Sequence, residues 1–341
     1  MEKSAKKNAV TQTDIARELN ISVVSVSNAL GGKRGVSEQL RQRILDAAEE
    51  LGYRRNNQTE TQENGALCIG ILISERYLSE SVSFYKNIYQ EIVRAASDKQ
   101  IFTVLEILDK EDETKTAMPD MLYKEQLHGI LVLGELKKEY IRLMKKESGI
   151  PVIFVDFYAD VPDTDFVISD GYHGTYQLTR SLIESGYRDI AFVGNIKATS
   201  SIMDRYLGYR KAMMEKRLPV CGDRLIKDRK EWDSEIYVEL PVELPEAFVC
   251  NCDRTAMLVI TLLKDRGCLV PENVGVTGFD YFAPDNNSGI RLSTYDVDCR
   301  AMARISINAL IRKIRHPDSP ARVRMVSGQV IMGNSFIRKE E

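Results

Sequence analysis

Apolar residues in the first 55 positions recur at helical spacing in three short segments. The pattern predicts helices over 14–19, 23–30 and 38–51, each with one apolar face. Ser22 and Ser37 stand directly before the second and third segments, where a serine side chain accepts hydrogen bonds from unpaired backbone N–H groups. We therefore expect a compact helical domain at the start of the chain.

The next segment, residues 56–65, has the sequence Asn-Asn-Gln-Thr-Glu-Thr-Gln-Glu-Asn-Gly and contains no apolar side chain. Such a stretch cannot bury a core of its own and is typical of a linker. The chain is therefore predicted to divide into a helical domain at 1–55, a linker at 56–66 and a larger domain at 67–341.

From residue 67 onward, short apolar runs alternate with stretches of helical pattern. The runs are apolar at every position, which is typical of parallel strands covered on both faces. They lie at 69–73, 129–133, 152–155, 190–193, 247–249 and 274–277. This alternation predicts an α/β domain with doubly wound parallel sheets. Ligands of such folds bind beyond the carboxyl ends of the strands, which here include Glu135, Asp156, Asn195, Asp253 and Asp280.

Charge changes this picture only locally. The chain has 47 Lys and Arg against 50 Asp and Glu, and its formal net charge is −3. The first sixty residues hold ten basic and eight acidic side chains, a charge of +2, which leaves −5 for the remainder. This weak asymmetry permits a nucleic-acid-binding surface on the helical domain without proving one.

Several protein classes are excluded by simple patterns. No run of eighteen apolar residues could span a membrane, and the first residues lack a signal-peptide pattern, so a cytoplasmic protein is expected. Six scattered cysteines without a C-x-x-C pair, and three dispersed histidines, favour reduced thiols over a zinc site. Without a nucleophile-elbow, Walker or metal-binding histidine motif, no metal, cofactor or enzymatic activity is expected.

Four motifs, in order along the chain, carry a resemblance to a known family. The first is Thr11–Gly32 with Val36–Arg54, the second is Leu182–Gly194 followed by Arg205–Ala212, the third is Cys250–Ala256, and the fourth is Val274–Asp280 leading to Leu292. Together they resemble the LacI/GalR family of bacterial transcription regulators. The resemblance implies a helix-turn-helix head joined to a two-lobed, type I periplasmic-binding-protein-like sensor domain.

The resemblance places the helix at 23–30 in the DNA major groove, with its first turn facing base edges. Ser22 and Ser25 can then donate to phosphates, while Val23 and Val24 present methyl groups to thymine. Asn28 stands where the family usually has arginine, and an asparagine there can pair with adenine. We therefore expect an altered operator, although these side chains could instead merely cover the surface of a small helix.

Five further residues are expected at the DNA interface by the same resemblance: Thr11, Ser27, Lys33, Arg34 and Asn56. The two basic residues either contact phosphates or remain solvated. The linker departs from the family, because it has no leucine to wedge into the minor groove and it carries two glutamates that DNA would repel.

For the sensor domain, the resemblance implies a small effector, most often a sugar or a purine, held between two lobes. Arg205 and Asp280 match the family's effector-binding arginine and aspartate, and such a pair suits hydroxyl groups that both donate and accept. An ion pair that only stabilises the lobe is the alternative. Trp232 is spaced like a pocket tryptophan that packs on a sugar ring, although it could equally lie in the core.

The remaining candidate pocket residues are Tyr85, Asp156, Phe157 and Asp253, each of which also has a purely structural alternative. Packing explains the aromatic rings equally well. Asp253 follows a strand and opens a helix, which predicts an N-cap. Cys252 replaces a family asparagine, and the segment between 232 and 248 is shortened and contains two prolines, so the sugar cannot be named.

The family organisation predicts an N-lobe at about 67–162 and 293–321 and a C-lobe at about 163–292 and 322–341. The helix at 299–314 carries apolar residues at helical spacing and lies in a lobe that contributes to dimers in the family. A homodimer would present two recognition helices to a pseudo-palindromic double-stranded DNA operator.

Three functional classes compete at this point. The first is a repressor controlled by a small carbohydrate, and the second is a carbon-control regulator that responds mainly to a protein co-regulator. The third, a transport-type binding protein or an enzyme on the same fold, is disfavoured by the helical head. Whether pure protein responds to sugars without a partner discriminates the first two.

Overall fold

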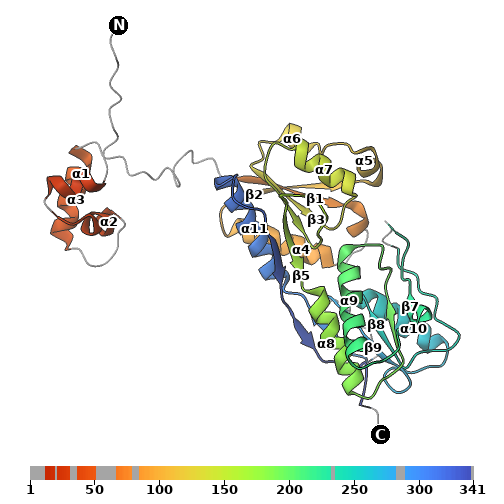
Figure 1. Ribbon diagram of the computed structural model, residues 1–341. Helices are drawn as coiled ribbons and strands as arrows, with labels where there is room; N and C mark the ends of the chain where they lie inside the picture. Colours follow the sequence, from red (N-terminus) through yellow and green to blue (C-terminus); the bar gives the residue numbers. More distant parts are fainter. Residues whose placement is uncertain are drawn as a thin grey trace. The chain divides into compact units, whose positions relative to one another are not determined.

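The computed structural model describes residues 12–19, 21–30, 37–50, 67–78, 84–231, 235–281 and 289–338. The chain separates into two compact units, Met1–Gly65 and Ala66–Glu341, which are described here one at a time. Figure 1 shows the helical first unit in red and the larger α/β unit from orange to blue.

The described part of the first unit consists of α1 (Gln12–Glu18), α2 (Val23–Leu30) and α3 (Glu38–Glu50). Their apolar faces meet in a small core, formed by Ile15, Ala16, Val26, Ala29, Ile44, Ala47 and Ala48. Both predicted caps are confirmed, because the Ser25 amide donates to Ser22 Oγ at 3.1 Å and the Leu40 amide donates to Ser37 Oγ at 3.3 Å.

The N-lobe of the second unit is built on a parallel sheet with the strand order β11-β5-β4-β3-β1-β2. Its strands are β1 (Cys68–Ser74), β2 (Phe102–Leu108), β3 (Gly129–Leu133), β4 (Val152–Val155), β5 (Asp165–Ser169) and β11 (Val323–Val326). Helices α4 (Phe84–Ser97) and α11 (Cys299–Arg315) pack on one face, and α7 (Lys138–Glu147) packs on the other. The short helices are η1 (Glu75–Tyr77), α5 (Lys110–Lys115) and α6 (Met121–Lys124).

The C-lobe repeats this plan around a smaller parallel sheet with the order β7-β6-β8-β9. Its strands are β6 (Ile190–Val193), β7 (Leu225–Ile226), β8 (Ala247–Cys250) and β9 (Gly275–Thr277). Helices α8 (Gly171–Glu184) and α9 (Ser200–Glu215) cover one face, and α10 (Asp253–Asp265) covers the other. A short 3-10 turn, η2 (Gly222–Arg224), precedes β7. The expected doubly wound architecture is confirmed.

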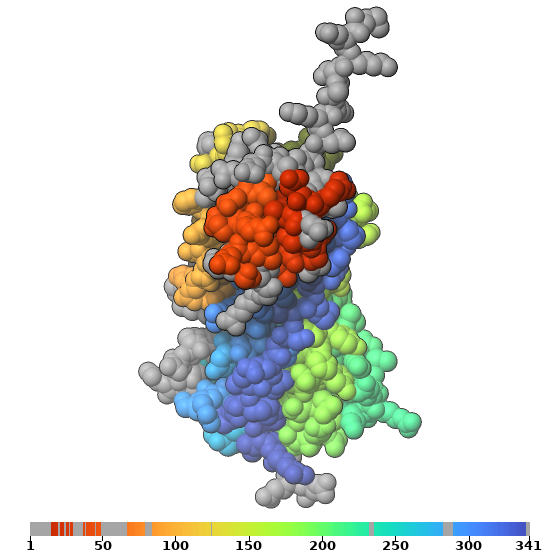
Figure 2. Space-filling view, turned by 90° about the vertical axis from the view of Figure 1, so that its left-hand side faces the viewer, coloured from red at the N-terminus to blue at the C-terminus, as the bar shows by residue number. Residues whose placement is uncertain are grey.

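Three chain segments connect the lobes. They leave β5 for α8, lead from β10 (Thr294–Asp296) into α11, and lead from β11 to β12 (Gln329–Ile331), which pairs antiparallel with β10. In Figure 2 the blue C-terminal segments run along both lobes beside the green α8. The predicted lobe boundaries were wrong here, because β5 pairs with β4 and β11 pairs with β5, so 165–169 and 323–326 belong to the N-lobe.

One buried carboxylate fixes this end of the N-lobe sheet. The Asp165 side chain is 1% exposed, and its Oδ1 accepts from Arg312 Nη2 at 2.9 Å, Arg324 Nη1 at 2.7 Å and the Arg322 amide at 3.2 Å. Lys313 Nζ lies 3.5 Å from Oδ2. Strand β5, helix α11 and strand β11 are thereby joined at a single side chain.

The C-lobe helices α8 and α9 lie side by side in Figure 1, and a glycine allows their close approach. A Cβ atom at Gly208 would lie 2.0 Å from the carbonyl oxygen of Tyr172, a backbone atom that cannot rotate away. The contact therefore requires glycine, even though glycine is a poor residue for the interior of a helix.

We expect Gly208→Ala to lower the free energy of unfolding by about 1–3 kcal/mol, because the methyl group forces the two helices apart. Alanine alone would favour the helix by about 1 kcal/mol, so a net loss reports the contact. Urea denaturation of the full chain measures this. Gly222→Ala, which meets nothing within 4 Å, is the control; equal effects of the two changes would contradict the explanation.

Candidate effector site and nucleic-acid-binding helix

Two aspartates follow strand ends in the left-handed backbone region, where non-glycine residues are uncommon. Asp156 follows β4 with φ +70°, and Asp280 lies close beyond β9 with φ +98°. Such strained residues persist where the surrounding structure holds them, often at functional sites. Both are substantially buried, and each carboxylate is held by specific partners.

On the N-lobe side, Asp156 is bound by two hydroxyl groups. Tyr85 Oη donates to Oδ2 at 2.9 Å, and Ser169 Oγ donates to Oδ1 at 3.2 Å. The ring of Tyr85 in turn packs against Tyr77, with 4.3 Å between the centroids. Burial raises the pKa of Asp156 to about 6, against the opposing attraction of Arg205.

On the C-lobe side, α9 directs Arg205 toward the carboxyl edge of the sheet. Its Nη2 donates to Asp280 Oδ1 at 3.1 Å and its Nη1 donates to the Asn251 carbonyl at 2.6 Å. The guanidinium lies 4.0 Å from the centroid of the Phe279 ring. Its Nε is buried and has no hydrogen-bond partner among the residues that the structure describes. The arginine is thus fixed on two sides.

These groups act on one another across the two lobes. Burial raises the pKa of Asp280, and the nearby guanidinium of Arg205 opposes that rise. The negative charge of Asp280 in turn adds to the raised pKa of Asp156, while Arg205 lowers it. The two carboxylates and the guanidinium of Arg205 therefore share one electrostatic environment, and the guanidinium of Arg229 adds a second positive charge that acts on Asp280.

Two of the expected pocket residues have other roles. Phe157 is 1% exposed and packs between Phe154 and Phe166, so its assignment to the pocket was wrong. Asp253 is the first residue of α10 rather than its N-cap, which is Cys252, a residue whose side chain makes no capping hydrogen bond.

Asp253 nevertheless has a buried partner, because Thr294 Oγ1 donates to its Oδ1 at 2.6 Å. That bond joins the start of α10 to β10, one of the segments that connect the lobes. Trp232 lies outside the described residues, and its expected pocket role stays a prediction.

Three hydrogen bonds between the lobes were not anticipated from sequence, one of them from the Tyr158 amide to Ser200 Oγ at 3.4 Å. Glu135 Oε2, beyond β3, accepts from the Ser200 amide at 2.6 Å, and Tyr158 Oη donates to Asp204 Oδ1 at 3.0 Å. Burial raises the pKa of both carboxylates. The only available signal was the position of Glu135 after a strand, and nothing in the sequence indicated its partner on the other lobe.

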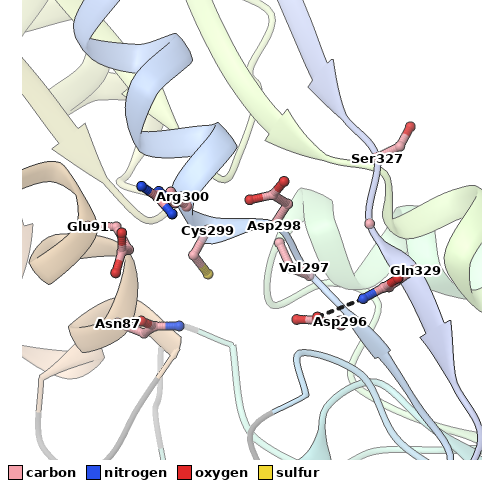
Figure 3. Close-up of a pocket in the computed structure, with 10 residues that line it drawn as sticks. Asn87, Glu91, Asp296, Val297, Asp298, Cys299, Arg300, Ser327 and Gln329 are labelled. Atoms are coloured by element: carbon pink, nitrogen blue, oxygen red, sulfur yellow. Dashed lines mark hydrogen bonds between the residues drawn. The ribbon is translucent and has the colours of Figure 1, made fainter. Parts of the chain in front are cut away.

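A groove of about 470 Å³ lies where the connecting segments meet α4 (Figure 3). Asn87 and Glu91 line it from α4, and the β10–α11 and β11–β12 segments supply the remaining residues. Asp298 caps α11 by accepting from the Ala301 amide at 2.7 Å, and Gln329 Nε2 donates to Asp296 at 3.4 Å. The groove is therefore part of the connection between the lobes, and the sequence had not indicated it.

In the first unit, α2 exposes a short polar and apolar surface. Val23 is 42% exposed, Ser22 is exposed, and Ser25 and Asn28 are half-buried. The hydroxyls of Ser22 and Ser25 lie 2.9 Å apart, so the pair bonds internally in this structure. The side chains of Val24 and Ser27, together with Thr11, Lys33, Arg34 and Asn56, lie outside the described residues.

Within the described residues, no helix is long and apolar enough to cross a membrane, and no group of His, Cys, Asp or Glu could hold a metal ion. Two family models match the chain. Residues 11–56 match "Bacterial regulatory proteins, lacI family", and residues 179–336 match "Periplasmic binding protein-like domain".

Similar proteins agree with these matches. The transcriptional regulator RegA of Clostridium saccharobutylicum is 30% identical over 322 residues, covering 89% of this chain and 94% of its own. A solved complex of the regulator CelR with cellobiose matches with a TM-score of 0.67 and 20% identity, covering 96% of this chain and 99% of that chain.

A lac repressor dimer bound to operator and the anti-inducer ONPF matches with a TM-score of 0.63 and 18% identity, and covers 96% of this chain and 99% of that chain. These likenesses confirm the expected fold, a helix-turn-helix head with a type I periplasmic-binding-protein-like domain. The chain belongs to the LacI family of bacterial regulatory proteins and is a DNA-binding transcriptional regulator, not an enzyme.

Proposed function

We propose that this regulator is a homodimeric repressor whose operator affinity is set by a small, hydroxyl-rich effector, a sugar or sugar derivative. One observation carries the proposal. Asp280 from the C-lobe pairs with Arg205 at 3.1 Å, and the charge of Arg205 also acts on the buried Asp156 from the N-lobe. A ligand bonded to both carboxylates would bridge the lobes.

The chemistry of these groups suits hydroxyls. Each sugar hydroxyl both donates and accepts, so it can donate to a carboxylate while accepting from the buried Nε of Arg205. The paired rings of Tyr77 and Tyr85 offer an apolar face for the C–H side of a sugar ring. The CelR neighbour, which was solved with cellobiose, supports this class of ligand by likeness of fold.

Helix α9 carries both the proposed ligand-binding arginine and residues that are bonded across the lobes. Arg205 lies one residue beyond Asp204 and five beyond Ser200, and these two form the bonds to Tyr158 and Glu135 across the lobes. A ligand that pulls on Arg205 therefore acts on the same rigid helix that contacts the N-lobe. By linkage, effector and operator must change each other's affinity by the same factor.

The dimer cannot use the apolar face of α11, because Met302, Ala309 and Leu310 of that face are buried in the N-lobe's own core. The edge strand β2 offers an alternative. Phe102 and Ile107 are 67% and 53% exposed there, and such an apolar edge pairs readily with another chain. Two copies joined at β2 would carry the two heads that a pseudo-palindromic operator requires.

We expect a sugar from a panel of sugars, sugar phosphates and purines to raise the melting temperature of the full-length protein. At 100 times its dissociation constant a ligand adds about 2.7 kcal/mol, or several degrees. Arg205→Ala should abolish the shift, whereas Arg210→Ala, on the same helix but against Tyr206, should retain it. A purine as the sole hit, or no hit at all, would contradict the carbohydrate proposal; the latter would favour a protein co-regulator.

Asp156→Asn should stabilise the ligand-free protein near neutral pH. Because the pKa of this carboxyl is raised to about 6 in the folded protein, its ionisation lowers the free energy of unfolding above pH 6. Protonation removes this loss as the pH falls toward the pKa of an aspartate in the unfolded chain. The gain should reach about 2–3 kcal/mol at pH 7.5 and shrink below pH 6. Urea denaturation across this range measures it, with exposed Asp98→Asn as control. A pH-independent difference would contradict the assigned protonation.

Asn28→Arg should change the preferred base at one half-site position from adenine toward guanine. Bidentate pairing discriminates a base by about 1–3 kcal/mol, which is roughly tenfold or more in affinity. Binding-site selection with both proteins measures the change, and Gln42→Arg, on the exposed face of α3, controls for added charge. Identical consensus sequences for the native and Asn28→Arg proteins would show that this side chain does not read the base.

A further inference from the structure

A second cavity lies in the N-lobe, at the end of the sheet opposite Asp156. It has a volume of about 320 Å³ and opens beside the amino ends of β4 and β5. Its walls combine lysines from the last turns of α7 and α11 with an apolar floor: Lys145, Lys146 and Lys313, then Ile150, Pro151, Val152, Phe154 and Pro317. The effector proposal does not involve this cavity.

Positive charge exceeds negative charge around it. The cations are Lys145, Lys146, Lys313, Arg312 and Arg324, and the carboxylates are Asp163, Asp165 and Glu147. Arg312, Lys313 and Arg324 are only 16–23% exposed and share Asp165 as their common carboxylate. Partly desolvated cations in such excess attract an anion, because burial weakens screening by water.

Lys145 is held in place for such an anion. Its Nζ donates to Thr164 Oγ1 at 3.2 Å and also bonds the Pro162 carbonyl, while burial and the neighbouring Lys313 lower its pKa. An ammonium group has three donors, so one remains for a ligand. A bound anion would offset the repulsion between the two lysines.

The cavity also holds a buried acceptor with no hydrogen bond. Asp165 is 2% exposed and lines the cavity, and its Oδ1 takes all three of the bonds described above. Its Oδ2 accepts none, although Lys313 Nζ lies 3.5 Å away. An unsatisfied buried acceptor calls for a donor. A phosphate group alone would meet the lysines but not this oxygen, whereas a ligand hydroxyl would satisfy it.

We propose that this cavity binds a small phosphate monoester that carries hydroxyl groups, with the phosphate on Lys145 and Lys313 and a hydroxyl on Asp165 Oδ2. The apolar floor of Ile150, Pro151 and Val152 accepts the carbon skeleton of such a ligand. A volume of 320 Å³ suits a compound of this size rather than a macromolecule.

The position of the cavity allows a ligand bound there to influence the proposed effector site through two strands. Strand β4 runs from Val152 at the cavity to Val155, and Asp156 follows it directly. Strand β5 runs from Asp165 to Ser169, whose hydroxyl donates to Asp156. The two sites therefore lie at opposite ends of the same two strands. A phosphate ester bound in this cavity would change the affinity for the effector without entering the effector site.

Calorimetric titration of the full-length protein with glycerol 3-phosphate, with glycerol and inorganic phosphate as separate probes, tests the site. We expect glycerol 3-phosphate to bind at one site per chain, and Lys145→Gln to weaken it about tenfold, as loss of one charged hydrogen bond predicts. Lys313→Gln should act likewise. Lys138→Gln, at the opposite end of α7, should leave the affinity unchanged, and so should Arg205→Ala. Thermal unfolding verifies that each variant is folded.

Three results would overturn the proposal. Absence of binding to the native protein is the first. Binding lost in Arg205→Ala but retained in Lys145→Gln is the second, because it would place the phosphate ester in the effector cleft and leave the proposed function standing. Equal affinity for inorganic phosphate and glycerol 3-phosphate is the third, since the hydroxyl would then contribute nothing.

Discussion

The two-lobed architecture depends on the burial of one carboxylate, that of Asp165. Charge removed from water at this depth is tolerated only when it is paired, and here Arg312, Arg324 and the Arg322 amide bond Oδ1 while the cation Lys313 lies beside Oδ2. The three elements so joined include both N-lobe strands that continue into the C-lobe. Removing the carboxylate would leave three cations facing one another at the root of these connections. The bond network thus anchors, on the N-lobe side, two of the segments that cross between the lobes.

The strands that sequence predicted and those it missed differ in their surroundings. Strands β1, β3, β4, β6 and β8 are covered on both faces and therefore read as continuous apolar runs. Strand β2 lies at the sheet edge, and its mixed pattern of exposed and half-buried residues gave no such run. Strand β5 was not among the predicted apolar runs, and it begins with the charged residue Asp165. Its burial depends on cations that are over a hundred residues away in the chain.

At the candidate effector site, too, local sequence patterns predicted only part of the structure. The rule that ligands bind beyond strand ends directed attention to Asp156 and Asp280. In the structure Asp280 pairs with Arg205 at 3.1 Å, and the charge of Arg205 also acts on Asp156. It failed one residue later, at Phe157. The left-handed backbone of Asp156 turns the chain so that its carboxylate faces Tyr85 while the next ring returns to the core. Backbone handedness at a single non-glycine position is not encoded in a local pattern.

Helix α9 constrains how this regulator could acquire a new specificity. Within nine residues it carries Ser200 and Asp204, bonded to the other lobe, then Arg205 of the proposed effector site, and Gly208 against α8. A substitution that adapts this helix to another ligand would disturb packing or lobe closure as well. Divergence among descendants of this protein is therefore expected to concentrate on the opposite wall, around Tyr85 and its neighbours. Substitutions on that surface would leave the contacts of α9 with the N-lobe and with α8 unchanged.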